Sequence, residues 1–290
     1  MSPVPAVPVK NTRNAAAQIN STKEPRGTKT SGLCFLYGNK ETGEVEEMNY
    51  EIDVHTHTVA SGHAYSTLQE MVRAAKEKGF KGLGITEHAP LMPGSCQEIY
   101  FRNLRVVPRE IDGLRLLLGV ELNIRDAWGN VDMSESTLRK LDVRIASMHR
   151  NIFPPKKKGK VMEAVKGALK NPYVDILGHP DDGNYGYDYE ELAQWAARYG
   201  KIIEINNASL RPTGIRPNAY ENDLKLLKAC SRYEIPVMMG SDAHISYDVG
   251  ACEMAQQVIE EAGYPAELVM NYNMEEFLHI LEKHRENWPQ

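Results

Sequence analysis

A polar residue, in most cases a histidine, follows one short apolar run after another along this 290-residue chain, and this repeat constrains the fold more than any other feature. The interval is roughly 30 residues, which is the length of one strand–helix unit in a parallel α/β protein. The residues that close the runs are His55, His88, Glu121, His149, His179, Asn206 and Asp242. Because parallel strands end on one face of a barrel, such a chain gathers these side chains at one place.

The apolar runs have the composition of buried strands. They cover residues 50–57, 82–86, 114–120, 141–146, 174–177, 201–205 and 235–239. After the first run, Thr67 is suited to cap a helix and Gly79 to end it. Further helical patterns cover residues 156–170, 189–199, 222–232, 250–262 and 274–283.

This alternation predicts one α/β domain, a distorted (β/α)7 TIM-like barrel with one strand fewer than the eight-stranded barrel. In a barrel, the side chains at the carboxyl ends of all strands converge on one cup. The alternative is an open doubly wound sheet, in which the strand ends spread along an edge. The regular return of polar residues favours the barrel.

Residues 1–47 differ from the rest of the chain. They have little apolar periodicity and are rich in Pro, Thr, Ser, Asn and Lys, which is typical of disorder. They also lack the charged region and apolar core of a secretory signal. We therefore expect a disordered leader over 1–47 and a folded domain over 48–290.

Bulk composition argues against several classes of protein. The net charge of -5 gives no basic footprint for nucleic acid, and no apolar run approaches the roughly 18 residues that a membrane span requires. Four cysteines lie far apart without CxxC spacing, which favours reduced thiols in a cytoplasmic protein. Nothing in the sequence marks a subunit interface, so the oligomeric state stays open.

The histidines are the candidate metal ligands. His55 and His57 lie two residues apart on one strand, so their imidazoles project to the same side. Of the nine histidines, seven lie at or just after strand ends, and His279 and His284 lie on the last predicted helix. Converging charged imidazoles would repel one another, whereas neutral imidazole is a good ligand for zinc, iron or manganese. We interpret His279 and His284 as solvated helix residues.

The motifs at these positions resemble those of the PHP (polymerase and histidinol phosphatase) superfamily of metal-dependent phosphoesterases, over about residues 50–285. They are Asp53-Val54-His55-Thr56-His57, Thr86-Glu87-His88, Gly119-Val120-Glu121, Ser147-Met148-His149, Gly178-His179-Pro180 and Gly240-Ser241-Asp242-Ala243-His244. Other stretches are similar to the small stand-alone YcdX-type phosphatases of this superfamily. They are Thr58-Val59-Ala60-Ser61, His63-Ala64-Tyr65-Ser66-Thr67 and Glu204-Ile205-Asn206-Asn207.

The resemblance implies a cup with three divalent metal ions, usually zinc, although manganese and iron also suit such sites. It implies that the first ion is held by His55, His57, Glu121 and Asp242, the second by Glu121, His149 and His179, and the third by His63, His88 and His244. All nine positions carry the residue type that the family uses. The candidate catalytic residues among them are Glu121, Asp242 and His244.

The implied activity is that of a trinuclear metal-dependent hydrolase, in which a metal-bound hydroxide attacks the phosphorus of a small phosphomonoester. The candidate substrate contacts are Arg150, Asn206 and Arg211. Arg216 and the lysine-rich segment 156–160 are further positive groups expected near the mouth of the cup. Glu87, where the family often has Asp, and Arg150 depart from the family pattern, which leaves the choice of substrate open.

Other functions share these residues. The site also suits a histidinol-phosphate phosphatase, or a phosphodiesterase or 3′–5′ exonuclease. The net charge of -5 and the absence of a recognisable nucleic-acid module weigh against the nuclease. An alternative of another class is a metal-binding regulatory barrel without catalysis, and the full set of ligands weighs against it.

Overall fold

The computed structural model describes residues 35–38 and 45–289. Strands β1 (Phe35–Gly38) and β2 (Val45–Met48) pair antiparallel, with Phe35 opposite Met48. The predicted disorder at 1–34 and 39–44 lies outside the described residues.

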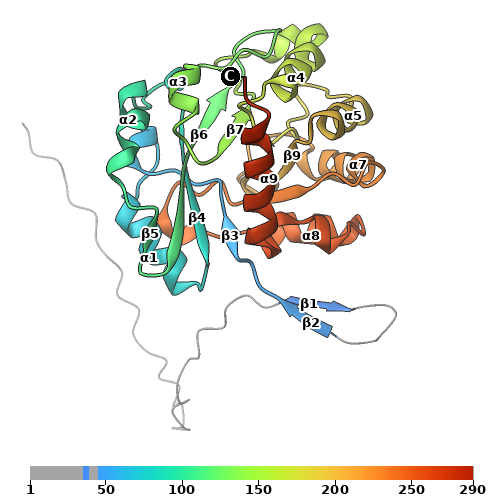
Figure 1. Cartoon of the computed structure of the whole chain (residues 1–290). Coiled ribbons are helices and arrows are strands. Elements are labelled where there is room, and N and C mark those ends of the chain that lie inside the picture. Colours follow the sequence, from blue (N-terminus) through green and yellow to red (C-terminus); the bar gives the residue numbers. More distant parts are fainter. Residues whose placement is uncertain (1–34, 39–44, 290) are drawn as a thin grey trace, which may run out of the picture. The chain divides into compact units, whose positions relative to one another are not determined.

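Seven parallel strands form the centre of the domain in the order β3-β4-β6-β7-β8-β9-β10 (Figure 1). They are β3 (Ile52–Asp53), β4 (Gly82–His88), β6 (Leu114–Asn123), β7 (Arg144–Ser147), β8 (Ile176–Gly178), β9 (Ile202–Asn206) and β10 (Val237–Gly240). The short β5 (Glu110–Ile111) pairs antiparallel with β6. In register, His88 lies opposite Glu121 and Gly240 opposite Asn206, so polar residues of neighbouring strands share one level.

The barrel is nearly closed, and its irregular seam lies between β3 and β10. At the carboxyl end, the His57 N–H donates to Ala243 O at 2.8 Å. Further down, the Asn271 side chain takes the place of a peptide group: it donates to Ile52 O (3.1 Å) and Met239 O (2.8 Å), and accepts from Met239 N (2.6 Å). The predicted distorted (β/α)7 barrel is thereby confirmed.

Helices cover the outside of the barrel. They are α1 (Leu68–Glu77), α2 (Glu98–Asn103), α3 (Glu135–Leu138), α4 (Val161–Lys170), α5 (Tyr189–Tyr199), α6 (Asn207–Leu210), α7 (Ala219–Ser231) and α8 (Glu253–Glu261). Short 3-10 turns are η1 (Val59–Ser61), η2 (Leu104–Val106), η3 (Pro155–Lys160), η4 (Ser246–Asp248), η5 (Ala266–Leu268) and η6 (Met270–Tyr272). As predicted, Thr67 caps α1. Its side chain accepts from Glu70 N, and the Glu70 side chain accepts from Thr67 N, which completes a capping box.

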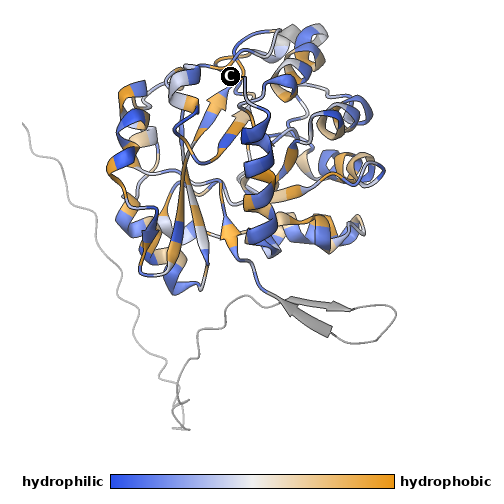
Figure 2. Ribbon diagram, viewed as in Figure 1, coloured by the Kyte–Doolittle hydropathy of each residue, from blue (hydrophilic) through white to orange (hydrophobic). Residues whose placement is uncertain are grey.

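The last helix, α9 (Met274–Glu286), lies across the barrel (Figure 1). Its Phe277 and Leu281 belong to the same apolar cluster as Ile52 and Ile202, which fill the barrel near the amino ends of the strands. Figure 2 shows hydrophobic residues concentrated in the strands, whereas the visible face of α9 is largely hydrophilic. Helix α9 therefore packs at the opposite end of the barrel from the polar residues at the carboxyl ends of the strands. Among the described helices, none combines the length and apolarity of a membrane span.

The expectation that His284 is solvated is wrong. This histidine is buried on the inner side of α9, with Nδ1 2.9 Å from Asp175 Oδ1 and Nε2 2.7 Å from Gly200 O. Asp175 also forms a fully buried ion pair with Arg144 at 2.7 Å. The local helical pattern could not reveal this, because Asp175 lies 109 residues away in the sequence. His279 is exposed, as expected.

Candidate metal centre

The structure brings all nine residues of the implied ligand set into one cup at the carboxyl ends of the strands. His88 ends β4 and Glu121 lies near the end of β6, whereas the others follow strand ends. His55, His57 and His63 follow β3, His149 follows β7, His179 follows β8, and Asp242 and His244 follow β10.

Glu121 lies at the centre of the cup and is 1% exposed. Its Oε1 is 2.9 Å from His179 Nε2 and 3.2 Å from His149 Nε2. Its Oε2 lies 2.5 Å from His88 Nδ1, without the direction of a hydrogen bond. One carboxylate thus faces histidines from three different strands, as a bridging ligand would.

A second group of ligand atoms gathers around Asp242. Its Oδ1 lies 3.3 Å from His57 Nε2 and 3.7 Å from His55 Nε2. One ligand atom from each of these three residues fits within 4.8 Å of the others. Because imidazole nitrogens and a carboxylate oxygen share this space, the three residues could hold one ion.

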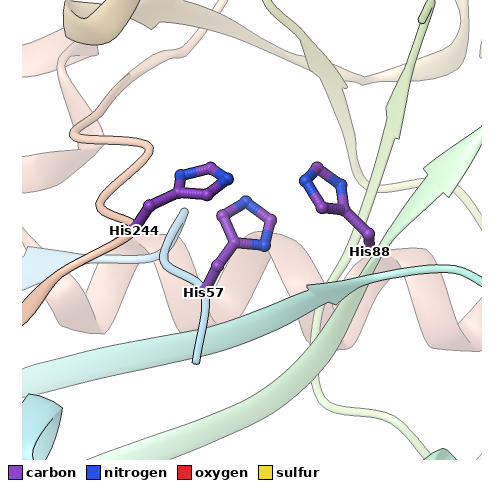
Figure 3. A group of neighbouring side chains, drawn as sticks. All are labelled: His57, His88 and His244. Carbon is purple, nitrogen blue, oxygen red and sulfur yellow. The ribbon is translucent and has the colours of Figure 1, made fainter. Parts of the chain in front are cut away.

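The third group is made of histidines alone. His57, His88 and His244 come from three different segments and converge (Figure 3), with ligand atoms within 4.8 Å of one another. His63 completes this side of the cup: its Nε2 lies 3.2 Å from His88 Nε2, and its ring centroid lies 4.9 Å from that of His244. Such imidazoles could hold a further ion.

The buried atoms of the cup fit metal ions better than they fit one another. Among the nine residues of the cup, five completely buried atoms have no hydrogen-bond partner in the part of the chain that the structure describes: His55 Nε2, His57 Nε2, His88 Nδ1, Glu121 Oε2 and Asp242 Oδ1. Each unpaired buried polar atom costs about 1–3 kcal/mol. Imidazole nitrogen and carboxylate oxygen are donors for zinc, manganese and iron, so bound ions would remove this cost.

The protonation states of Glu121, His57 and His179 also suit metal binding. Burial would by itself raise the pKa of Glu121, but the imidazoles of His149 and His88 outweigh burial and hold that pKa well below its ordinary value. Burial and the neighbouring His88 lower the pKa of His57 well below its ordinary value. Burial is likewise the main cause of the lowered pKa of His179. An ionised carboxylate and neutral imidazoles are the forms that coordinate metal.

Hydrogen bonds from outside the cup fix several of the imidazoles. Asn123 Oδ1 lies 2.7 Å from His149 Nδ1, and Ser61 Oγ lies 3.1 Å from His57 Nδ1. A partner at one ring nitrogen fixes the tautomer and turns the other nitrogen toward a metal. Sequence reasoning missed Asn123 and named Ser61 only as part of a family motif. Asn123 could have been found, because it lies two residues after Glu121 and so projects from the same side of β6.

Two buried glutamates support the cup as well. Glu204 Oε1 lies 2.5 Å from His55 Nδ1, and the sequence singled out Glu204 only as part of a family motif. Glu87 accepts from Thr58 N at 3.0 Å and from Ser61 Oγ at 2.6 Å. The carboxylate of Glu87 therefore holds the loop that follows β3.

The predicted substrate contacts Arg150 and Arg211 are held by partners at the rim. Arg150 Nε is 2.8 Å from Asp182 Oδ2, and its Nη2 donates to Ile215 O at 2.6 Å. Arg211 Nη1 is 2.7 Å from Asp248 Oδ2. Among the hydrogen bonds and ion pairs of the described residues, none joins either guanidinium to one of the nine proposed ligands.

Asn206 and Arg216 lie closer to the ligands. Asn206 is fully buried, and its Nδ2 lies 3.3 Å from Asp242 Oδ2 while its Oδ1 accepts from Ser209 N at 3.0 Å to cap α6. Arg216 donates to Ser209 Oγ at 2.7 Å, and its Nη2 lies 3.7 Å from Asp242 Oδ2. Of the arginines considered from the sequence, Arg216 is the one whose guanidinium reaches a ligand.

Known proteins have sequences similar to this one. Residues 53–210 match the family model described as "PHP domain". A protein named "Probable phosphatase" from Caldicellulosiruptor saccharolyticus is 45% identical over 243 residues, which is 83% of this chain and 99% of the relative. A protein of the same name from Acetivibrio thermocellus is 41% identical over 239 residues, which is 82% of this chain and 98% of the relative.

Among solved structures, the fold is similar to that of a histidinol phosphate phosphatase from Lactococcus lactis, complexed with zinc, L-histidinol and phosphate. The TM-score is 0.57 at 19% identity, over 74% of this chain and 95% of that one. At this identity the likeness shows the fold alone. The family match and the name that the relatives share confirm the predicted enzyme class, a hydrolase. With more than half of its length matched by the family model, the chain belongs to the PHP domain family.

Proposed function

We propose that this hydrolase is a phosphatase that binds three divalent metal ions, with zinc as the preferred ion, and hydrolyses a small phosphomonoester. The observation that supports this most strongly is the cup itself, in which nine imidazoles and carboxylates converge and five of their buried atoms have no hydrogen-bond partner within the described residues. An ordinary structural cluster would satisfy these atoms internally.

The proposed assignment of ligands is the one that the family resemblance implies. The first ion takes His55, His57, Glu121 and Asp242, the second takes Glu121, His149 and His179, and the third takes His63, His88 and His244. Glu121 contacts His149 and His179 of the second site and also lies 3.5 Å from His55 Nε2 and 3.7 Å from His57 Nε2 of the first, which supports a bridging role between the two ions. His57 lies close to both Asp242 and His244, and His88 lies close to both Glu121 and His244. Because these histidines are shared between groups of ligand atoms, the three ions would be close neighbours.

Such ions, when bound, would lower the pKa of a coordinated water toward ~7 and neutralise the oxygens of a phosphate. The residues of the chain supply position and charge around them. We assign the phosphate contact to Arg216, because its guanidinium already reaches Asp242 and a planar fork of donors matches phosphate oxygens. Arg150 would hold the loop that carries Arg216, through its bond to Ile215 O.

We propose the substrate only as a chemical class, a small phosphomonoester. Histidinol phosphate is one candidate alcohol ester, since the structurally similar protein is a histidinol phosphate phosphatase. A phosphodiester is the other chemical alternative that this site suits, and a metal-binding barrel without turnover is the non-enzymatic one. A cytoplasmic location stays a prediction of the sequence.

The proposal is tested by metal analysis and hydrolysis of an aryl phosphate on one preparation of the full chain. We expect ~3 metal ions per chain and turnover that a chelator abolishes and zinc restores. Hydrolysis of a bis-aryl phosphodiester in preference to the monoester would favour the diesterase. Bound metal without turnover on either ester would favour the regulatory barrel.

A further inference from the structure

Glu204 is a buried carboxylate that lies outside the proposed ligand set but touches two of its members. It occupies the middle of β9 and is 1% exposed. We propose that Glu204 is a positioning residue that orients one ligand of each of two neighbouring metal sites, one with each carboxylate oxygen. This inference rests on the proposed metal centre.

The two oxygens of Glu204 have different partners. Oε1 lies 2.5 Å from Nδ1 of His55, whose Nε2 faces Asp242 and Glu121. Oε2 accepts the backbone N–H of His179 at 2.7 Å, and the imidazole of His179 faces Glu121. One rigidly held carboxylate therefore spans a ligand of the first ion and a ligand of the second.

The contact with His55 sets which ring nitrogen is available. A neutral histidine that binds metal through Nε2 must carry its proton on Nδ1, and a carboxylate at Nδ1 stabilises that tautomer and the ring orientation. Glu204 is the carboxylate in that place. Without it, His55 would be free to present the wrong nitrogen or to rotate.

The contact with His179 holds an unfavourable backbone. His179 has φ of 31°, in the left-handed region that residues with a Cβ rarely adopt. Such a conformation persists when surrounding contacts enforce it. The bond from His179 N to Glu204 Oε2 is such a contact, and this backbone conformation aims the imidazole at Glu121.

The neighbouring strand leaves room for this carboxylate. Gly240 of β10 lies next to Glu204, and a Cβ added at Gly240 would overlap Glu204 Oε1. A methyl group at position 240 would therefore displace the carboxylate without removing it. This gives a second route to disturb Glu204 that is independent of its own substitution.

Asp175 offers a matched control. It is also a fully buried carboxylate that accepts from a backbone N–H, that of Arg144 at 2.9 Å, and faces an imidazole, that of His284 at 2.9 Å. It lies just before β8, at the amino end of the barrel and away from the cup. Its substitution should reduce stability without changing the affinity for metal.

The experiment is a zinc titration against a competing chelator, on full-length protein stripped of metal, with the melting temperature of each metal-free variant as a check on folding. Glu204→Gln should weaken two of the zinc ions by about 10–100-fold and leave the third unchanged. Gly240→Ala should have a similar effect. Gly240→Ala should add little in a Glu204→Ala background, because the shortened side chain removes the overlap and leaves His55 Cβ, 3.2 Å from the new methyl group, as the closest remaining neighbour.

A second readout is independent of the affinity. In zinc-loaded protein, ¹⁵N chemical shifts of the histidine rings should report a proton on His55 Nδ1 and a metal-bound Nε2 in the wild type, and a different or mixed state of this ring in Glu204→Ala.

The outcomes are distinct. A wild-type protein that binds no zinc would refute the proposed metal centre. A wild type that binds zinc, with Glu204→Gln of equal affinity, would refute only the role of Glu204. Equal losses of affinity in Glu204→Gln and Asp175→Asn would mean that general destabilisation explains the effect. Additive effects of Gly240→Ala and Glu204→Ala would exclude displacement of the carboxylate as the cause.

Discussion

Glu121 concentrates more of the site's chemistry than any other single residue. Both of its oxygens face imidazoles, and its ionised form is favoured by them against the effect of burial. Glu121→Gln keeps the shape but removes the charge that two ions would share. We expect it to lower metal content by more than one ion per chain and turnover by at least ~100-fold, as measured by metal analysis and initial rates. Full metal content with a near-normal rate would contradict the bridging role.

Arg216 and Arg211 allow a test of which guanidinium meets the phosphate. Loss of a charge-assisted hydrogen bond costs about 1.5–3 kcal/mol, so Arg216→Ala should reduce kcat/KM for an aryl phosphate by about 10–100-fold. Arg211 forms a rim ion pair with Asp248, and such pairs contribute about 0–1 kcal/mol. Arg211→Ala should therefore change kcat/KM by less than about fivefold. The reverse order would restore Arg211 as the substrate contact.

Position in the sequence indicated which residues converge in the cup, but it did not indicate which residues hold those side chains in place through hydrogen bonds. His55 and His179 could be expected at strand ends because the strand period places them there. Their shared partner Glu204 lies 149 and 25 residues from them, so only the closed barrel brings the three together. Local sequence patterns do not reveal such supporting residues, because the residues meet their partners only through tertiary contacts.

Among the elements, α9 depends on a buried polar anchor as well as on its apolar face. Removing His284 would leave Asp175 with one charged partner fewer in a buried site, which is costly. We expect His284→Ala to reduce the free energy of unfolding by about 2–4 kcal/mol, measured by urea denaturation. The exposed His279→Ala on the same helix should change it by less than about 0.5 kcal/mol. Equal effects of the two substitutions would contradict a specific anchor.

The same anchor predicts a dependence of stability on acid. Burial would raise the pKa of Asp175, but Arg144 and His284 outweigh burial and lower it below the ordinary 3.8. A lowered pKa in the folded state stabilises the protein at pH values above 3.8, and this contribution is lost as pH falls below it. The stability difference between wild type and Asp175→Asn, measured by urea denaturation with chelator present, should be constant near neutral pH and shrink below ~pH 4. A stability difference that grows as the pH falls would contradict the lowered pKa of Asp175.

For the whole molecule, the seven strand–helix units follow from periodicity, whereas the closure of the barrel does not. The first strand was expected over 50–57, yet only Ile52–Asp53 pairs regularly with β4. The chain then leaves the ladder, and Asn271 bridges β3 and β10 with its side chain from 219 residues away. A side chain that replaces a peptide group has no signature in local sequence, so the seam could not be placed in advance.

The barrel and its proposed ligands occupy only part of the chain. All nine proposed ligands lie between residues 55 and 244, and the strands and helices of the barrel lie between Ile52 and Glu286. Removal of residues 1–47 takes away none of them. We expect a chain that starts at Met48 to keep its metal content and its kcat on an aryl phosphate within about twofold, and its melting temperature within about 4 °C, the shift that ~1 kcal/mol would produce. Loss of folding in this variant would show that the leader contributes to the barrel, and loss of turnover alone would place a leader residue at the cup.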